Sequence, residues 1–343
     1  MSALTFVVPE ASAPSGGHTY DRRIAAALGG LGRPVRAVTL AGAWPRPGRR
    51  ATAELSAVLA RAPDGARVLV DGLVACGVPE AVLPQAGRLR LTVLVHLPLA
   101  DETGLAPDVA RELDARERAV LRGGVDAVAT SAWAARRLAE HHDLERVAVV
   151  RPGVDLAPLA RGSGFEECSD SVPRLVCVAS LTPRKGHDLL LGALSGLRNL
   201  SWTCVCAGPG APAPRPGLEG RVRFTGPVVG AELDQVYDSA DLLVLASRAE
   251  TYGMVVTEAL ARGVPVVATR VGGLSEALGR TSDGRLPGLL VPPEDTAALR
   301  RALRTWLTGQ DLREQLREAA RLRRSELAGW PEAARTMAQV LDL

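Results

Sequence analysis

The sequence predicts an α/β protein made of two doubly wound domains, each with a parallel sheet. The 343 residues are enough for about two domains of roughly 150 residues each. Short apolar runs alternate with helical patterns along both halves of the chain. Most of these runs are continuously apolar, which is typical of strands that helices cover on both faces.

Twelve such runs are the expected strands. They are 5–8, 35–40, 67–70, 91–95, 127–130 and 147–150 in the first half, and 174–178, 202–206, 222–224, 242–245, 264–268 and 288–291 in the second. The polar stretch 161–173 lacks periodicity and should be the linker. The expected domains are therefore 1–160 and 174–328, which would face a central cleft. Residues 329–343 should form a final helix, with Pro331 at an early position.

The composition argues against several classes of protein. The 41 Lys and Arg residues nearly balance 38 Asp and Glu residues, so a formal charge of +3 does not indicate a nucleic acid partner. No apolar run is long enough for a membrane span or a signal peptide, so we expect a cytoplasmic protein with at most peripheral membrane contact. The five cysteines lack metal-ligand spacing. Cys204 and Cys206 alternate in an apolar run and should face one side of a buried strand.

Two glutamates mark a candidate site in the second half. Glu250 lies between an apolar run and a helical pattern, and Glu258 lies inside that pattern. The backbone N–H groups of Gly253, Met254 and Val255 would lie at the helix N-terminus, where unpaired donors and the helix dipole favour a phosphate. The two carboxylates suit neighbouring hydroxyls of a sugar or ribose. Alternatively, one glutamate is a capping charge at the helix N-terminus and the other is a solvated residue of the helix.

The only lysine of the chain belongs to a second candidate site. Lys185 stands among 40 arginines and follows Arg184, shortly after the strand 174–178. Ligands of open α/β sheets bind beyond the carboxyl ends of the strands, where these two cations would meet a diphosphate. In so arginine-rich a chain, a lysine followed by Gly186 favours a compact ammonium group in a tight site. The alternative is an ordinary solvated turn.

Glycines and a histidine follow strands of the first half. Gly16 and Gly17 lie between the first strand and the first helix, where they would allow close backbone approach to a ligand. Paired glycines in a loop are also common in simple turns. His96 directly follows the strand 91–95 and belongs at the same sheet edge, with a structural hydrogen bond as the alternative role. Three other histidines should be peripheral, on a helix surface or capping a helix: His141, His142 and His187.

Taken in order, these segments resemble the retaining glycosyltransferases of family 4, whose GT-B fold has two Rossmann-like domains. The matching segments are 16–17, 93–96, 127–131, 150–155, 181–190, 224–226, 237–242, 250–258, 263–269 and 272–273. The resemblance covers the whole chain and is strongest from about 174 to 295. Its most specific part is Glu-x7-Glu followed by Ala-Leu-Ala-x-Gly-x-Pro-Val-Val.

The resemblance implies roles for residues of the second domain. Glu258 resembles the carboxylate that binds the ribose hydroxyls of the nucleotide. Glu250 resembles the carboxylate that meets the donor sugar. Arg184 and Lys185 resemble the cations that bind the diphosphate, helped by the N–H groups at the helix N-terminus. Val228, which follows Phe-Thr-Gly, would lie near the base.

In the first domain, the resemblance places Gly17 near the β-phosphate, with Gly16 beside it. His96 would lie near the sugar or the acceptor hydroxyl, which makes His96 and Glu250 the candidate catalytic residues. The final helix of the family crosses back to the first domain, and residues 329–343 should do the same.

The implied reaction moves a sugar from a nucleotide-diphosphate sugar to an acceptor hydroxyl, with retention at the anomeric carbon. UDP is more frequent than GDP in the family, and no cofactor is expected besides the donor substrate. The chain has no Asp-x-Asp motif, in agreement with protein cations rather than a metal ion stabilising the leaving diphosphate. A nucleotide-sugar 2-epimerase and a non-catalytic subunit that binds sugar nucleotides are the alternatives.

Two positions depart from the family pattern. Many members have an asparagine before the Pro-Gly-Val-Asp turn, where this chain has Arg151, to which we assign no role. Many members have an arginine five residues before the lysine, where this chain has Ser180, so the second cation must be Arg184 or another residue. The acceptor is expected to bind the first domain. The loop 44–50 contains Arg46, Arg49 and Arg50, which could contact anionic lipid or an acidic acceptor, with a solvated loop as the alternative.

Overall fold

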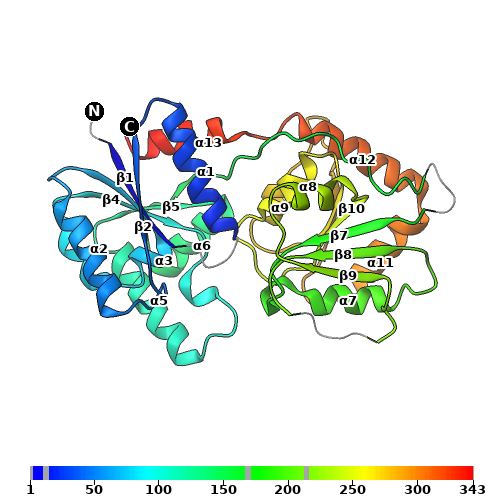
Figure 1. Ribbon diagram of the computed structural model, residues 1–343, viewed down its shortest axis with the longest axis horizontal. Helices are drawn as coiled ribbons and strands as arrows, with labels where there is room; N and C mark the ends of the chain where they lie inside the picture. The colour runs from blue at the N-terminus through cyan, green and yellow to red at the C-terminus, as the bar shows by residue number, and fades with distance from the viewer. Residues whose placement is uncertain (1–2, 11–14, 167–170, 212–215, 343) are drawn as a thin grey trace. The chain divides into compact units, whose positions relative to one another are not determined.

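The computed structural model describes residues 3–10, 15–166, 171–211 and 216–342, which form two compact α/β units. The first unit consists of Met1–Gly153 and Gly329–Leu343, and the second of Val154–Ala328. Each unit contains one six-stranded parallel sheet, and the strand positions agree with all twelve predicted runs (Figure 1). None of the helices in the described part of the chain has the length and apolarity needed to cross a bilayer.

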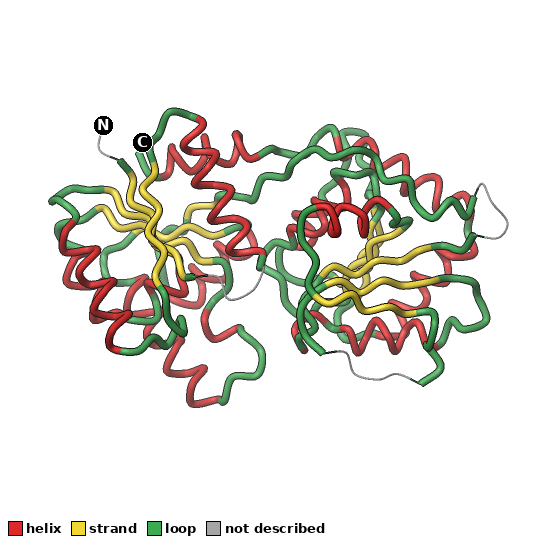
Figure 2. The backbone as a smooth tube through the Cα atoms, viewed as in Figure 1, coloured by secondary structure: helices red, strands yellow, loops and turns green. Residues whose placement is uncertain are grey.

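The first sheet has the strand order β2-β1-β3-β4-β5-β6. Its strands are β1 Leu4–Pro9, β2 Val35–Leu40, β3 Arg67–Asp71, β4 Arg90–Val95, β5 Asp126–Ala129 and β6 Ala148–Val149. The helices are α1 Gly16–Gly30, α2 Arg49–Arg61, α3 Gly72–Ala75, α4 Pro79–Val82, α5 Pro107–Leu121, α6 Ala132–His142 and α13 Trp330–Val340, with 3-10 turns η1 Leu83–Gln85 and η2 Leu99–Asp101. Helices α2 to α6 contribute buried side chains to one hydrophobic cluster of this unit. Figure 2 shows helices beside the strands of the sheet.

The second sheet has the order β12-β11-β10-β7-β8-β9. Its strands are β7 Arg174–Val178, β8 Thr203–Ala207, β9 Val222–Gly226, β10 Leu242–Leu245, β11 Val266–Thr269 and β12 Gly288–Val291. The helices are α7 His187–Ser195, α8 Ala231–Asp238, α9 Met254–Leu260, α10 Leu274–Leu278, α11 Thr296–Thr308 and α12 Gln310–Arg324, with the 3-10 turn η3 Pro183–Lys185. Two hydrophobic clusters cover opposite faces of this sheet.

The cysteines of β8 lie on one face of the second sheet, as their alternation predicts. Cys204 and Cys206 belong to the same hydrophobic cluster as Cys177 on the neighbouring strand. The hydrogen bond with Cys206 and then burial raise the pKa of the Cys177 thiol, which suits a packing role. Cys168 lies outside the described residues.

The predicted linker is wrong where it can be compared. The division between the units falls between Gly153 and Val154, and residues 154–328 belong to the second unit. The Arg161 guanidinium donates to Asp238 at 2.7 Å, and the Ser163 hydroxyl donates to Asp241 at 2.6 Å. These carboxylates hold a polar segment that lacks periodicity but is nevertheless bound to its domain. Residues 167–170 of the predicted linker lie outside the described residues.

The final helix α13 packs against α1 within the first unit, and Figure 1 shows the two helices side by side. The Trp330 ring meets the Tyr20 ring edge-on, with 5.6 Å between centroids. Gly153 makes this contact possible, since a Cβ there would lie 2.3 Å from the backbone nitrogen of Trp330. An aromatic pair and a glycine therefore fix the place where the chain returns to the first unit.

Candidate functional site

The carboxyl edge of the second sheet brings Lys185 and Glu250 together. The Lys185 ammonium donates to Glu250 Oε1 at 2.6 Å, and the Ser247 hydroxyl donates to the same oxygen at 2.8 Å. The Arg184 guanidinium lies 3.9 Å from Glu250 Oε2. Glu250 is only 6% exposed, so its carboxylate is desolvated and neutralised by protein groups.

Arg184 is the second cation beside this carboxylate, and its role as the second cation at a diphosphate stays a prediction. The nearest rival along the chain is Arg248, but its guanidinium is bound to Asp188 at 2.8 Å and to Glu294 at 2.5 Å. Arg184 also donates to the Ala249 carbonyl at 3.3 Å, which fixes it against the loop that carries Glu250.

The loop between β7 and α7 is held against the end of β10 by backbone contacts. The Arg248 N–H donates to the Arg184 carbonyl at 2.7 Å. Gly186 has a φ of +65°, and a Cβ there would lie 1.9 Å from the Ala246 carbonyl oxygen. Only glycine fits this approach, so Gly186 explains how Lys185 comes within reach of Glu250.

A pair of glycines after β11, Gly272 and Gly273, fixes the Glu250 loop from the other side. Gly272 has a φ of +54°, and a Cβ there would lie 1.6 Å from the Glu250 carbonyl oxygen. The Gly273 N–H donates to that same oxygen at 3.0 Å. The turn after β11 therefore positions the backbone of Glu250, and Lys185 positions its side chain.

Helix α9 begins directly behind Glu250. Gly253 precedes it with a φ of +93°, and no side chain caps the first turn. The N–H groups of Gly253, Met254 and Val255 lie at this end, where the helix dipole favours an anion. These backbone donors follow Glu250 by three to five positions in the chain.

Glu258, one turn into α9, is held by a tyrosine. The Tyr237 hydroxyl donates to Glu258 Oε2 at 2.7 Å, and Arg262 stacks on the Tyr237 ring at 4.7 Å. Burial raises the pKa of Glu258, and the bond from Tyr237 opposes that shift. Val228 lies in the loop between β9 and α8, half-buried against the cluster that contains Tyr237.

In the first unit, Gly17 and His96 lie together. Gly16 and Gly17 form the first turn of α1, whose N-cap is Ser15. A Cβ at Gly17 would lie 3.2 Å from His96 Cδ2, so the small residue leaves room for the imidazole. The predicted glycine turn and the predicted strand-end histidine therefore belong to one local structure.

Two acidic residues that the sequence analysis did not select complete this structure. His96 Nε2 lies 2.8 Å from Asp21 Oδ1 and 3.5 Å from Asp71 Oδ2. Asp71 ends β3 beside β4, so its place at a strand's carboxyl end was a usable signal. Asp21 lies in the second turn of α1 and carried no signal of its own.

The three remaining histidine expectations were mostly wrong. His142 is fully buried and bonds Glu117 Oε2 at 3.0 Å, while His141 is half-buried beside Asp114. His187 begins α7 but is buried, with Nε2 3.6 Å from Cys177 Sγ. Each side chain found a partner on another element, which the polarity of its own helix could not reveal.

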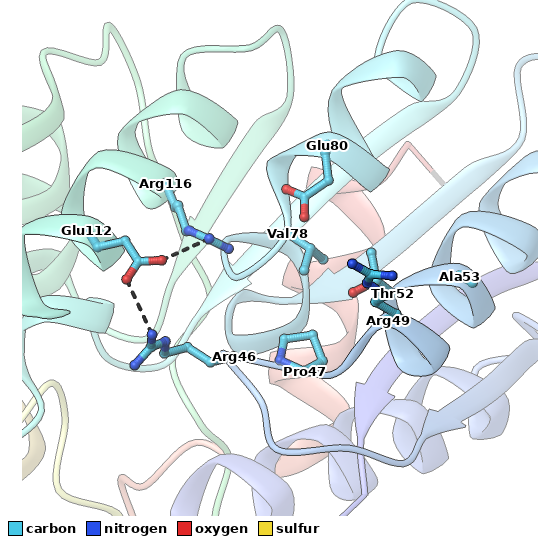
Figure 3. A pocket seen from close by; sticks show the side chains of 9 residues that line it. All are labelled: Arg46, Pro47, Arg49, Thr52, Ala53, Val78, Glu80, Glu112 and Arg116. Atoms are coloured by element: carbon cyan, nitrogen blue, oxygen red, sulfur yellow. Dashed lines mark ion pairs between the residues drawn. The ribbon is translucent and has the colours of Figure 1, made fainter.

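A pocket of about 720 Å³ lies beside the loop 44–50 of the first unit (Figure 3). It is bounded by this loop, the start of α2, the segment 78–80 and α5, and its charged residues are Arg46, Arg49, Glu80, Glu112 and Arg116. Glu112 is shared by Arg116 at 2.8 Å and Arg46 at 3.6 Å. The loop is fixed at its start, because the Trp44 ring N–H donates to the Leu40 carbonyl at 3.1 Å.

Comparison with known proteins gives these sites a context. Residues 172–309 match the family model described as "Glycosyl transferases group 1". The chain is 32% identical over 247 residues to a D-inositol 3-phosphate glycosyltransferase of Salinispora tropica, covering 63% of this chain and 50% of that protein. The chain spans about half the length of the curated relatives it matches.

Solved structures agree over the whole chain at low sequence identity. A sucrose-phosphate synthase from Thermosynechococcus elongatus superposes with a TM-score of 0.78 and 19% identity, covering 99% of this chain and 98% of that one. Anabaena HepE in complex with UDP-glucose gives a TM-score of 0.73 at 17% identity, covering 99% and 100%. The chain therefore has the GT-B fold, and its residues 172–309 match the model of the group 1 glycosyl transferases.

Proposed function

We propose that the protein is a retaining glycosyltransferase of family 4. It moves a sugar from a nucleotide-diphosphate sugar to an acceptor hydroxyl without a metal ion, and UDP is favoured over GDP as the nucleotide. The observation that carries the proposal is the cluster of Lys185, Arg184 and Glu250 at the carboxyl edge of the second sheet. Two cations beside one carboxylate leave a net positive charge, which suits a diphosphate at this edge.

The cluster explains how the leaving group would be stabilised. Breaking the anomeric C–O bond places negative charge on the nucleoside diphosphate. Lys185 and Arg184 are already ordered by Glu250, so they need little reorganisation when that charge develops. The N–H groups at the start of α9 add donors on the same side. Glu250 would then meet the donor sugar, and the leaving phosphate would take the acceptor's proton.

The nucleotide and the reaction type can be tested together. Titration calorimetry with UDP-, GDP- and ADP-glucose identifies the donor, and NMR of the sugar in an acceptor-free reaction detects epimerisation. With an acceptor present, the anomeric configuration of the product reports retention or inversion. Full turnover in excess EDTA is expected; inhibition that added Mg²⁺ reverses would contradict the proposed metal independence.

Glu258→Ala is expected to raise the KM for the donor by about 10-fold or more, because a lost bond to a charged group costs about 1.5–3 kcal/mol. The Tyr237 bond occupies Oε2, which leaves Oε1 of Glu258 available for a ribose hydroxyl. Glu232→Ala, at an exposed site on α8, is the matched control. An unchanged donor KM in Glu258→Ala would remove the ribose role from this residue.

We further propose that the acceptor carries an anionic group. The pocket in Figure 3 supports this, because Arg46 and Arg116 share one carboxylate while Arg49 forms no ion pair with any described residue. The relatives named D-inositol 3-phosphate glycosyltransferases supply a first acceptor to try.

Arg49→Ala is expected to weaken binding of inositol 3-phosphate while leaving binding of inositol unchanged, since only the former carries a phosphate. An exposed charge contact is worth up to about 1 kcal/mol, so the expected loss is several-fold. Arg36→Ala, at an exposed position of β2, is the matched control. Equal effects of Arg49→Ala on the two compounds in calorimetry would contradict a phosphate contact at Arg49.

A further inference from the structure

Three titratable side chains from different elements meet at the carboxyl edge of the first sheet. His96 follows β4, Asp71 ends β3, and Asp21 lies on α1. A single ring nitrogen, Nε2 of His96, faces both carboxylates, at 2.8 Å from Asp21 Oδ1 and 3.5 Å from Asp71 Oδ2. With both carboxyl groups ionised, this arrangement requires a proton on Nε2, because an unprotonated nitrogen would point its lone pair at two oxygens.

Both carboxylates are withdrawn from water. Asp21 is 4% exposed and Asp71 is 2% exposed. Asp71 Oδ1 accepts the N–H of Leu73 at 2.7 Å, whereas Asp21 Oδ2 is buried without a hydrogen-bond partner in the described structure. A buried pair of carboxylates is costly unless a cation or a proton lies between them. The imidazole is the group in a position to supply that charge.

The orientation of the ring follows from its neighbours. The ring edge that carries Cδ2 and Nε2 faces α1, with Gly17 beside Cδ2 and Asp21 beside Nε2. The Tyr20 ring packs edge-on at 5.2 Å between centroids. The opposite edge, with Nδ1 and Cε1, is therefore turned away from α1. The side chain is 18% exposed, and Nδ1 makes no hydrogen bond to any described residue.

The titration of the cluster agrees with this geometry. Burial lowers the pKa of His96, but Asp21 and then Asp71 outweigh it and raise the pKa above the ordinary value of 6.5. Burial, followed by the charge of Asp21, raises the pKa of Asp71 to about 7. The titratable groups that face the imidazole in the described structure are Asp21 and Tyr20 from α1 and Asp71 from β3.

We propose that Asp21 and Asp71 are positioning residues that hold His96 as an imidazolium, with Nε2–H bound to Asp21 and Nδ1–H presented outward to a hydroxyl oxygen of the bound substrate. The inference rests on the proposed function, since it deepens the role of His96 in sugar transfer. It makes His96 a hydrogen-bond donor rather than the base that removes the acceptor's proton, because a doubly protonated ring has no lone pair to accept one.

The test is an NMR titration of the full chain labelled with ¹⁵N-histidine, which requires no turnover. His96, assigned by comparison with His96→Gln, is expected to carry protons on both ring nitrogens at pH 7 and to titrate above 6.5. Asp21→Asn and Asp71→Asn should each move the titration downward. Asp108→Asn, an exposed site on α5, should leave it unchanged. A neutral His96 at pH 7, or a titration indifferent to both variants, would overturn the proposal.

A metal ion is the competing occupant, because the same three groups lie close enough together to share one. Stoichiometric Mn²⁺ should leave the His96 resonances sharp, and selective broadening of them would overturn the imidazolium assignment. If the transferase activity is present, Asp21→Asn should lower kcat with little change in the donor KM, and Asp21→Glu should restore part of the loss. If no transfer occurs but the titration is as expected, the proposed function fails and the positioning network stands.

Discussion

Lys185→Ala is expected to lower donor turnover by more than about 10-fold. Among the described residues, the ammonium is the only positively charged group within 3 Å of Glu250, and a charge-assisted contact to phosphate is worth about 1.5–3 kcal/mol. The substitution also leaves a buried carboxylate with only Ser247 and the more distant Arg184 as partners. Both effects weaken the site for a diphosphate.

A comparison of ligands separates the phosphate contact from general damage. In calorimetry, Lys185→Ala should strongly weaken the binding of UDP and leave the binding of uridine nearly unchanged, because uridine has no phosphate. Lys185→Arg should recover only part of the loss, since a planar guanidinium does not replace a compact ammonium in a tight turn. Arg223→Ala, an exposed cation on β9, is the control for net charge. Turnover of Lys185→Ala within about tenfold of the unmodified protein would contradict the diphosphate assignment.

The fold could be predicted from the sequence because the strands are buried on both faces. Continuous apolar runs such as 242–245 leave no choice of exposed side, and every residue of β10 is indeed buried. The linker could not be located in the same way. Its polar residues Arg161 and Ser163 bind Asp238 and Asp241, which lie more than seventy positions further along the chain. Local polarity does not distinguish a free connector from a segment held by distant carboxylates.

The candidate sites were predicted in part. Glu250 and Lys185 could be selected because each follows a strand, but their 2.6 Å contact depends on β7 and β10 being neighbours. Local sequence patterns do not predict the order of the strands in a sheet. Asp21 was missed for a related reason, since a polar residue in the second turn of a helix is ordinarily solvated. Its contact with His96 becomes visible only when the fold brings the end of β4 and α1 together.

Gly272→Ala is expected to produce the largest loss of stability, together with weaker donor binding. An alanine at φ +54° costs about 1–2 kcal/mol for the left-handed backbone. Its Cβ would also lie 1.6 Å from the Glu250 carbonyl oxygen, and forcing backbone apart in a packed site costs about 1–3 kcal/mol more. The loop that carries Glu250 must move, so the Kd for UDP should rise along with the fall in unfolding free energy.

Gly284→Ala isolates the steric part of this effect. Gly284 also has a left-handed φ, of +86°, but a Cβ there would meet no atom within 4 Å. Gly284→Ala should therefore lower the free energy of unfolding in urea only by the cost of the left-handed backbone, and it should leave UDP binding unchanged. Equal losses of stability in the two variants would mean that the turn after β11 yields without strain. In that case Gly272 would not position Glu250, and the order of the donor site would depend on the side-chain contacts of Glu250 with Lys185 and Ser247.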